Sequence, residues 1–234
     1  MDVKVTLMKL TFYGQNCFHI ALQDKQLLVD PFISDNPLSK DKVAIDSIEA
    51  DYILLTHAHE DHVLDAEAIA TRTGAIIVSN YEIAMYYQQR GIEVHPMNHG
   101  GKWQFDFGVL KMVQAVHTSS FADGTYGGQP AGFVLSADDH TIYIAGDTSL
   151  TFDMKLLPLH HQIDVAILPI GDNFTMGITD AVIASDFIEC DQIIGCHYDT
   201  FGFIEIDHDN ARDAFAKANK TLHLLAICES FTVA

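Results

Sequence analysis

Basic side chains are scarce in this chain of 234 residues, which has 13 Lys and Arg against 32 Asp and Glu. The formal net charge of −19 gives a surface that repels the phosphates of nucleic acids and of anionic lipids. We therefore disfavour a nucleic-acid partner, expect no membrane partner, and favour a small-molecule substrate. Bound cations would offset this charge locally, so a small anionic substrate stays open.

The chain also lacks long apolar runs and paired cysteines. No run approaches the roughly 18 apolar residues of a transmembrane helix, and the first residues lack the apolar core of a signal peptide, so we expect a cytoplasmic protein. The four cysteines form no Cys-x-x-Cys pair, which argues against a structural zinc–thiolate site. We predict that all are buried, reduced thiols: Cys17, Cys190, Cys196 and Cys228.

Several common catalytic motifs are absent as well. No Gly-x-Ser-x-Gly elbow is present to supply a serine nucleophile. Gly127-Gly128 lacks the strand-to-helix setting of a phosphate-binding loop. No low-complexity linker interrupts the sequence, and hydrophobic residues make up 48% of it. We therefore expect one domain over residues 1–234 with a full core.

The apolar runs predict two β-rich sections, each followed by alternating strands and helices. The predicted strands are 9–13, 17–22, 26–29, 52–56, 75–79, 93–97, 102–107, 109–117, 131–137, 141–145, 164–169, 192–196 and 222–227. The predicted helices are 64–72, 81–90, 179–189 and 209–218, with Asn80 and Thr179 as N-caps. Two similar halves with helices outside imply an α/β fold, a four-layer αββα sandwich.

The densest chemical signal is Thr56-His57-Ala58-His59-Glu60-Asp61-His62, which directly follows an apolar run. Imidazole nitrogen and carboxylate oxygen are good ligands for zinc, manganese and iron. None of these groups is buried cheaply without a partner. A metal ion is therefore the simplest reason for the cluster.

Polar residues also follow three other predicted strands. Ligands gather at the carboxyl ends of strands, so we expect these ends to meet in one cavity. Taken one at a time, His117 and His197 fit a structural role as well as a ligand role, and Asp147 after Gly146 fits the more common role of a turn or N-cap residue. The complete predicted set is His57, His59, Asp61, His62, His117, Asp147 and His197. Seven donors exceed one tetrahedral zinc and suit two divalent ions with a bridging carboxylate.

A second polar segment, Gly171 to Gly177, follows another predicted strand. Asp172, Asn173 and Thr175 could line the pocket and bind substrate, although a structural turn explains the segment equally well. For the other eight histidines we expect ordinary structural roles, with His19 and His99 the least certain.

These residues resemble a known superfamily. His57 to His62 matches the H-x-H-x-D-H signature of the metallo-β-lactamase fold, and His117, Asp147 within Gly-Asp-Thr, and His197 follow in that superfamily's order. A narrower resemblance, to the UPF0173 metal-dependent hydrolases, covers nearly the whole chain. It rests on Pro169 to Gly177 followed by Asp180-Ala181, on Met97-Asn98 with Gly100-Gly101, and on His197-Tyr198 with Thr200-Phe201. That branch is similar to the L-ascorbate-6-phosphate lactonases.

The resemblance implies an αββα fold and a metal-dependent hydrolase. It implies that His57, His59 and His117 hold one ion, that Asp61, His62 and His197 hold the other, and that Asp147 bridges. The nucleophile would be a metal-bridging hydroxide, which Asp61 would also orient as a catalytic residue. Hydrolysis of a small ester, lactone or phosphoester follows, with a slight preference for an ester or a phosphorylated sugar derivative.

The chain departs from the branch at one turn, where Gln15-Asn16 replaces the usual His-Ser and leaves the role of that loop open. Three other functions stay open: a phosphodiesterase or nuclease of the same fold, an iron-dependent oxidoreductase, and a non-catalytic metal-binding protein. Zinc or manganese is favoured over iron, and formation of a homo-oligomer is left open.

Overall fold

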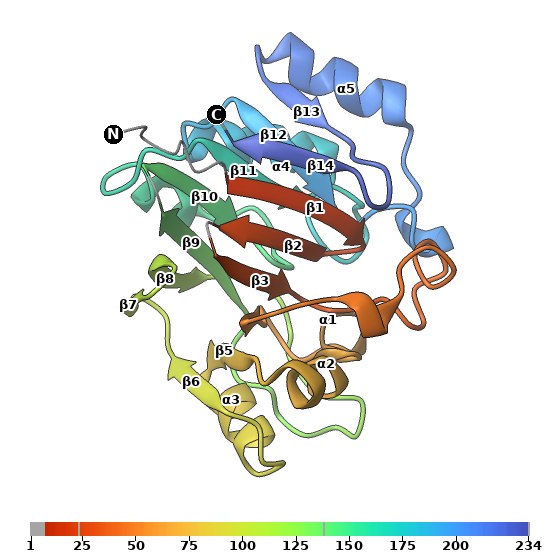
Figure 1. Cartoon of the computed structure of the whole chain (residues 1–234). Coiled ribbons are helices and arrows are strands. Elements are labelled where there is room, and N and C mark those ends of the chain that lie inside the picture. The colour runs from red at the N-terminus through yellow and green to blue at the C-terminus, as the bar shows by residue number, and fades with distance from the viewer. Residues whose placement is uncertain (1–7, 23, 138, 234) are drawn as a thin grey trace, which may run out of the picture.

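Two seven-stranded mixed sheets face one another in the computed structural model, which describes residues 8–22, 24–137 and 139–233 (Figure 1). The first sheet has the strand order β14 (Ser230–Val233), β1 (Met8–Gly14), β2 (Cys17–Leu22), β3 (Lys25–Val29), β4 (Tyr52–Leu54), β5 (Ile76–Asn80) and β6 (Val94–Met97). The second has the order β13 (Thr221–His223), β12 (Gln192–Cys196), β11 (Val165–Pro169), β10 (His140–Ile144), β9 (Ala131–Ala137), β8 (Gly108–Gln114) and β7 (Lys102–Phe105).

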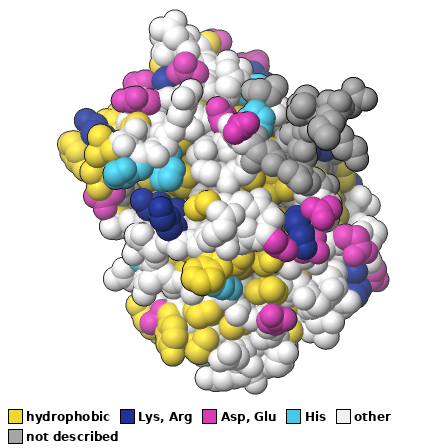
Figure 2. Space-filling model, turned by 60° about the vertical axis from the view of Figure 1, so that its left-hand side comes forward, with side chains coloured by type: hydrophobic (Ala, Val, Ile, Leu, Met, Phe, Trp, Pro, Cys, Tyr) yellow, Lys and Arg dark blue, Asp and Glu magenta, His cyan; other side chains and the backbone are white. Residues whose placement is uncertain are grey.

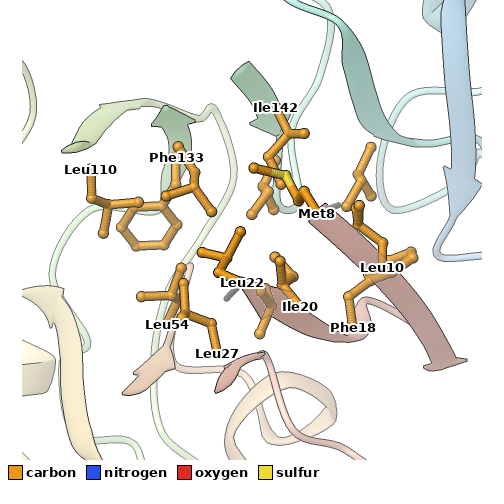
Figure 3. Packing of buried hydrophobic residues seen from close by; sticks show 14 of the residues in the cluster. Met8, Leu10, Phe18, Ile20, Leu22, Leu27, Leu54, Leu110, Phe133 and Ile142 are labelled. Atoms are coloured by element: carbon orange, nitrogen blue, oxygen red, sulfur yellow. The ribbon is translucent and has the colours of Figure 1, made fainter. Parts of the chain in front are cut away.

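The main hydrophobic core lies between the two sheets. Side chains at alternate positions of β1 point inward, so Met8, Leu10 and Phe12 are buried while Lys9 is exposed. Figure 3 shows Leu22 and Leu54 of the first sheet facing Leu110 and Phe133 of the second sheet. Burial of these apolar surfaces is the main force that holds the two sheets together.

Helices cover the outer face of each sheet. The first sheet packs against α1 (Glu60–Val63), α2 (Ala66–Thr73) and α3 (Tyr81–Gln88), and the second against α4 (Ile178–Phe187) and α5 (His208–Lys217). The predicted four-layer αββα sandwich is therefore confirmed. Among the described residues, no helix combines the length and the apolarity needed to span a bilayer.

Four local predictions were wrong. Thr179 is not an N-cap, because α4 begins at Ile178 after Gly177. The predicted strand 222–227 ends at His223, and a separate strand, β14, returns to pair with β1 in the other sheet. Of the cysteines, Cys228 is exposed. The predicted strand 109–117 ends at Gln114, so His117 lies in the following loop.

Asn80 ties helix α3 to the loop beside the metal-ligand cluster. Its side-chain oxygen accepts a hydrogen bond from the backbone nitrogen of Ile83 at 2.9 Å, which confirms the predicted N-cap. Its Nδ2 donates to the carbonyls of Gly127 and Gln129 at 2.7 and 3.1 Å. The buried Ser119 hydroxyl also donates to the Gly127 carbonyl. Asn80 therefore fixes the course of the chain that follows His117.

Replacing Asn80 with Ala should destabilise the fold more than loss of an exposed cap does. The N80A variant loses a cap and leaves two carbonyls without their donor, so we expect a loss of about 2–3 kcal/mol in the free energy of unfolding. Asp207 caps α5 through the backbone nitrogens of Asp209 and Asn210 at an exposed position, so D207A should cost only about 1 kcal/mol. Urea denaturation measures both, and equal losses would contradict this account.

Candidate metal centre

The cluster from Thr56 to His62 lies just beyond the carboxyl end of β4. Its backbone turns into the four-residue helix α1, which carries Asp61 and His62, while His59 stands at the N-cap position in extended conformation. The turn places successive donors on one side instead of alternating them as a strand would. His57 and His62 are fully buried, and His59 and Asp61 are partly exposed.

The structure brings all seven predicted donors together. Three overlapping groups have ligand atoms within 4.8 Å of one another: His57, His59 and His117; His57, His62 and Asp147; and Asp61, His62 and His197. Both sheets contribute to this site. The donors follow β4 of the first sheet and β8, β10 and β12 of the second. Groups of this kind and spacing can hold divalent metal ions.

Asp147 lies between the imidazole groups. Its Oδ2 is 3.5 Å from His117 Nε2 and 3.0 Å from His197 Nε2, while its Oδ1 is 3.4 Å from His62 Nε2. The preceding Gly146 has a φ of 63°, and a side chain there would collide with Thr56 and the Ala131 carbonyl. The Gly-Asp-Thr motif thus brings the carboxylate close against the loop that follows β4.

Three imidazoles are held neutral by their surroundings. Burial lowers the pKa of His57 well below its ordinary value, and it also lowers the pKa of His59 and His117. A neutral imidazole keeps a nitrogen lone pair, which is the form that binds a metal ion.

The other half of the site has the opposite electrostatics. Burial alone would lower the pKa of His62 and His197, but the carboxylates of Asp147 and Asp61 outweigh it. The pKa of His62 is therefore raised well above its ordinary value, and that of His197 is raised to about 9. These carboxylates draw positive charge to the spot, either as protons on the imidazoles or as a cation that displaces them.

Buried polar atoms in the site fit a metal ion well. His62 Nε2 and Asp147 Oδ1 are both buried and have no hydrogen-bond partner within the described part of the chain. The ion-pair partners of the Asp30, Asp61 and Asp147 carboxylates are all histidines among the described residues. Unpartnered buried atoms and uncompensated carboxylates are costly, and a cation would satisfy both.

Asp30 supports the site from behind, a role that the sequence analysis missed. Its Oδ2 accepts hydrogen bonds from His62 Nδ1 at 2.8 Å, from Asn16 Nδ2 at 2.6 Å and from the Thr56 hydroxyl at 2.6 Å. A carboxylate behind an imidazole fixes its tautomer and aims its other nitrogen at a metal. Asp30 follows strand β3, so the rule applied to the other strand ends would have found it.

The turn between β1 and β2 also reaches the site. The fully buried Gln15 donates from Nε2 to Asp61 Oδ2 at 2.8 Å, and its carbonyl accepts from the backbone nitrogen of His197 at 2.8 Å. The departure at this turn therefore leaves the loop in contact with the predicted metal ligands. The uncertain histidines lie elsewhere, since His19 contacts the Glu49 carbonyl and His99 the Pro130 carbonyl.

A cavity of about 890 Å³ opens above the donors. His59, Asp61, His117, Asp147 and His197 line its floor. Asp172, Asn173 and Thr175, predicted to bind substrate, do not line it, whereas Phe174 from the same loop does. Asp172 instead borders a separate groove beside α4. Aromatic residues from this loop could not be foreseen, because loop sequence does not show which side chains face a cavity.

Comparison with known proteins places the chain in a family. The sequence profile of the Beta-lactamase superfamily domain matches residues 9–197. A UPF0173 metal-dependent hydrolase of Christiangramia forsetii is 66% identical over 95% of this chain and 99% of its own length. One from Flavobacterium johnsoniae is 59% identical over the same shares of the two chains.

A solved structure agrees with this placement. A metallo hydrolase from the archaeon Ignicoccus hospitalis is 31% identical and superposes with a TM-score of 0.88, over 97% of this chain and 98% of that one. The chain is therefore a member of the UPF0173 metal-dependent hydrolases, within the β-lactamase superfamily.

Proposed function

We propose that this protein is a binuclear metallohydrolase that adds water to a small ester, lactone or phosphoester in the cavity above the seven donors. In this proposal His57, His59 and His117 would hold one divalent ion, Asp61, His62 and His197 would hold the other, and Asp147 would be shared between them. Zinc and manganese suit this mixture of imidazole and carboxylate.

The observation that carries the proposal is the position of Asp147. One of its oxygens lies near His117 and His197, and the other lies near His62. A single carboxylate within reach of both imidazole sets is the arrangement that two neighbouring cations require of a bridging ligand. Structural metal sites are closed, whereas this one lies at the floor of an open cavity, which favours catalysis.

Two bound cations would activate water at neutral pH and polarise the bond to be cleaved. The chain's own residues supply the rest. The side chain of Asp61 is 26% exposed, so it is the more accessible of the two predicted carboxylate ligands and can orient the attacking water by accepting a hydrogen bond from it. The Nε2 atom of Gln15 donates a hydrogen bond to Asp61 Oδ2 and so holds that carboxylate in place. Thr118 lies at the cavity wall, 3.3 Å from His59 Nε2, and limits rotation of that ring.

The distribution of charge disfavours the nuclease alternative. Figure 2 shows Lys and Arg side chains in separate spots on one face, with no continuous basic track among the described residues drawn there. The residues that line the cavity, within the described part of the chain, include no Lys or Arg. A nucleic-acid backbone needs a positively charged groove, so a small substrate fits better.

Metal analysis of the purified protein tests the binuclear site. After dialysis against zinc or manganese, elemental mass spectrometry should find two divalent ions per chain. In the H117A variant we expect about one. His160 is exposed and lies outside the cavity, so H160A should keep both ions. A single ion in the unmodified protein, or two ions in H117A, would contradict the assignment.

The support from Asp30 can be measured separately. The D30N variant places an amide where His62, Asn16 and Thr56 all donate, so affinity for the more weakly held ion should fall about 10- to 100-fold. Competition with a chromogenic chelator gives that affinity. D106N removes an exposed carboxylate that pairs with Lys25 and should bind metal normally. Unchanged affinity in D30N would show that Asp30 does not position the ligand.

Turnover tests the proposed reaction itself. The metal-loaded protein should hydrolyse at least one class among lactones, carboxylic esters and phosphoesters, and chelation should abolish this. In D61N we expect kcat to fall by about two orders of magnitude or more, because the carboxylate that helps to hold one ion and orients the water is lost. E67Q, on the exposed face of α2, is the matched control. Full activity in D61N would rule out the role given to Asp61, and a bound pair of metals without hydrolysis would rule out the reaction.

A further inference from the structure

The wall of the cavity differs in character from its floor. Above the histidines and carboxylates, the wall includes five apolar side chains: Phe32, Leu64, Phe174, Phe201 and Phe203. Four of the five are phenylalanines, and they come from three separate segments of the chain. We call these five residues the apolar collar.

The aromatic residues of the collar form two pairs. The rings of Phe174 and Phe203 meet edge to face with centroids 6.3 Å apart, and those of Phe32 and Phe201 lie 6.2 Å apart at 40°. Phe203 is 77% exposed and Phe174 is 51% exposed. Large rings that stay in water contribute little to the core, so their place at the mouth of a catalytic cavity points to a ligand.

The segments that carry these rings are firmly held. The loop before Phe174 is closed by a bridge between Gly171 and Gly177 and contains two residues with left-handed backbone, Asp172 and Asn173. Met176 is buried, and its backbone nitrogen donates to the Thr148 carbonyl at 3.0 Å. Phe174 is thus displayed by a loop whose other end is anchored beside Asp147.

The second segment is the 3-10 helix η3 (Gly202–Ile204). Ile204 is fully buried, and its carbonyl accepts from the backbone nitrogen of Asp199 at 2.9 Å. The Asp199 carboxylate in turn accepts from the Ile206 nitrogen and contacts His208 Nε2. This anchoring keeps Phe203 at the cavity while its ring remains in solvent.

The charges around the cavity narrow the class of substrate. No Lys or Arg lines it among the described residues, and the two charged groups outside the predicted ligands are the exposed carboxylates of Asp35 and Glu60. An anionic group placed beyond the metal ions would meet phenyl rings and carboxylates and would find no cationic partner. An uncharged apolar group would instead bury its surface against the collar.

We infer that the substrate is an uncharged carboxylic ester, thioester or lactone with an aromatic or similarly bulky apolar group, and that an anionic group away from the reacting bond is excluded. This inference rests on the proposed hydrolase function. For an ester, the oxygen of water bonds to the carbonyl carbon and the bond from that carbon to the alcohol oxygen breaks. One proton of water goes to the departing alcohol, the other is released, and the products are a carboxylate and an alcohol.

Three methyl esters compared on the metal-loaded protein test the preference by proton release in a pH-stat. We expect kcat/KM for methyl phenylacetate to exceed that for methyl acetate by about tenfold or more, since burial of a phenyl ring adds apolar contact. Methyl 4-carboxyphenylacetate has the same ring with an added negative charge and should be the poorer of the two aromatic esters by about tenfold.

A matched pair of variants links the preference to the collar. Phe203 and Phe152 are 77% and 76% exposed and both lie in 3-10 helices, but Phe152 packs beside Phe187 outside the cavity. F203A should bring the ratio of the kcat/KM values for phenylacetate and acetate esters close to one, mainly through KM. F152A should leave that ratio unchanged. An unchanged ratio in F203A, or equal ratios in both variants, would overturn the inference.

A binding measurement separates this inference from the proposed reaction. Hydroxamates bind metal ions without turnover. The difference in affinity between acetohydroxamate and phenylacetohydroxamate, measured by calorimetry, therefore reports the contribution of the apolar collar to binding. We expect about tenfold tighter binding of the phenyl compound, which F203A abolishes and F152A preserves. Ester hydrolysis without discrimination between the two hydroxamates would refute the apolar preference and leave the hydrolase function standing. Discrimination without hydrolysis of any ester would refute the reaction and support the preference.

Discussion

The burial of three carboxylates among histidines, with no Lys or Arg as ion-pair partner in the described residues, is the constraint on which this structure depends. Asp30 and Asp147 are almost wholly removed from water, and Asp61 is partly so. Negative charge at such a place is tolerable only with compensating positive charge. Divalent cations supply more charge than imidazolium protons do, and they satisfy the unpartnered donor atoms at the same time. A bound cation would therefore meet the electrostatic requirement that the local fold creates.

The sandwich meets this requirement by bringing together the ends of two sheets that are distant in sequence. The same face-to-face packing that forms the core sets the distance between the loop after β4 and the loop after β10. Gly146 permits close approach of the two loops, and Asn80 holds the chain that follows His117. The precision of the site is thus a consequence of packing in regions far from the chemistry, as rigid supporting elements generally provide.

Much of this arrangement could be predicted from the sequence, because strand periodicity and the spacing of residues 57–62 are local signals. The rest depends on tertiary structure. Asp30 follows a predicted strand, so its place at the site could have been foreseen, but nothing local shows that three donors converge on it. Strand β14 was missed because it pairs with the far end of the chain, and Thr179 looked like a cap although the helix begins one residue earlier. Phe203 is exposed while its neighbour Ile204 is buried, and composition does not show which of two adjacent apolar residues faces the core.

In the proposed reaction, the apolar collar would bind an uncharged group of the substrate, and metal ions on the cavity floor would bind its carbonyl group. That description requires two cations bridged by one carboxylate. Anomalous diffraction from crystals of the metal-loaded protein, recorded at the metal's absorption edge, tests this most directly. The account predicts two peaks about 3.5–4 Å apart, each in contact with the Asp147 carboxylate. A single peak, or two peaks of which one has no contact with Asp147, would contradict it.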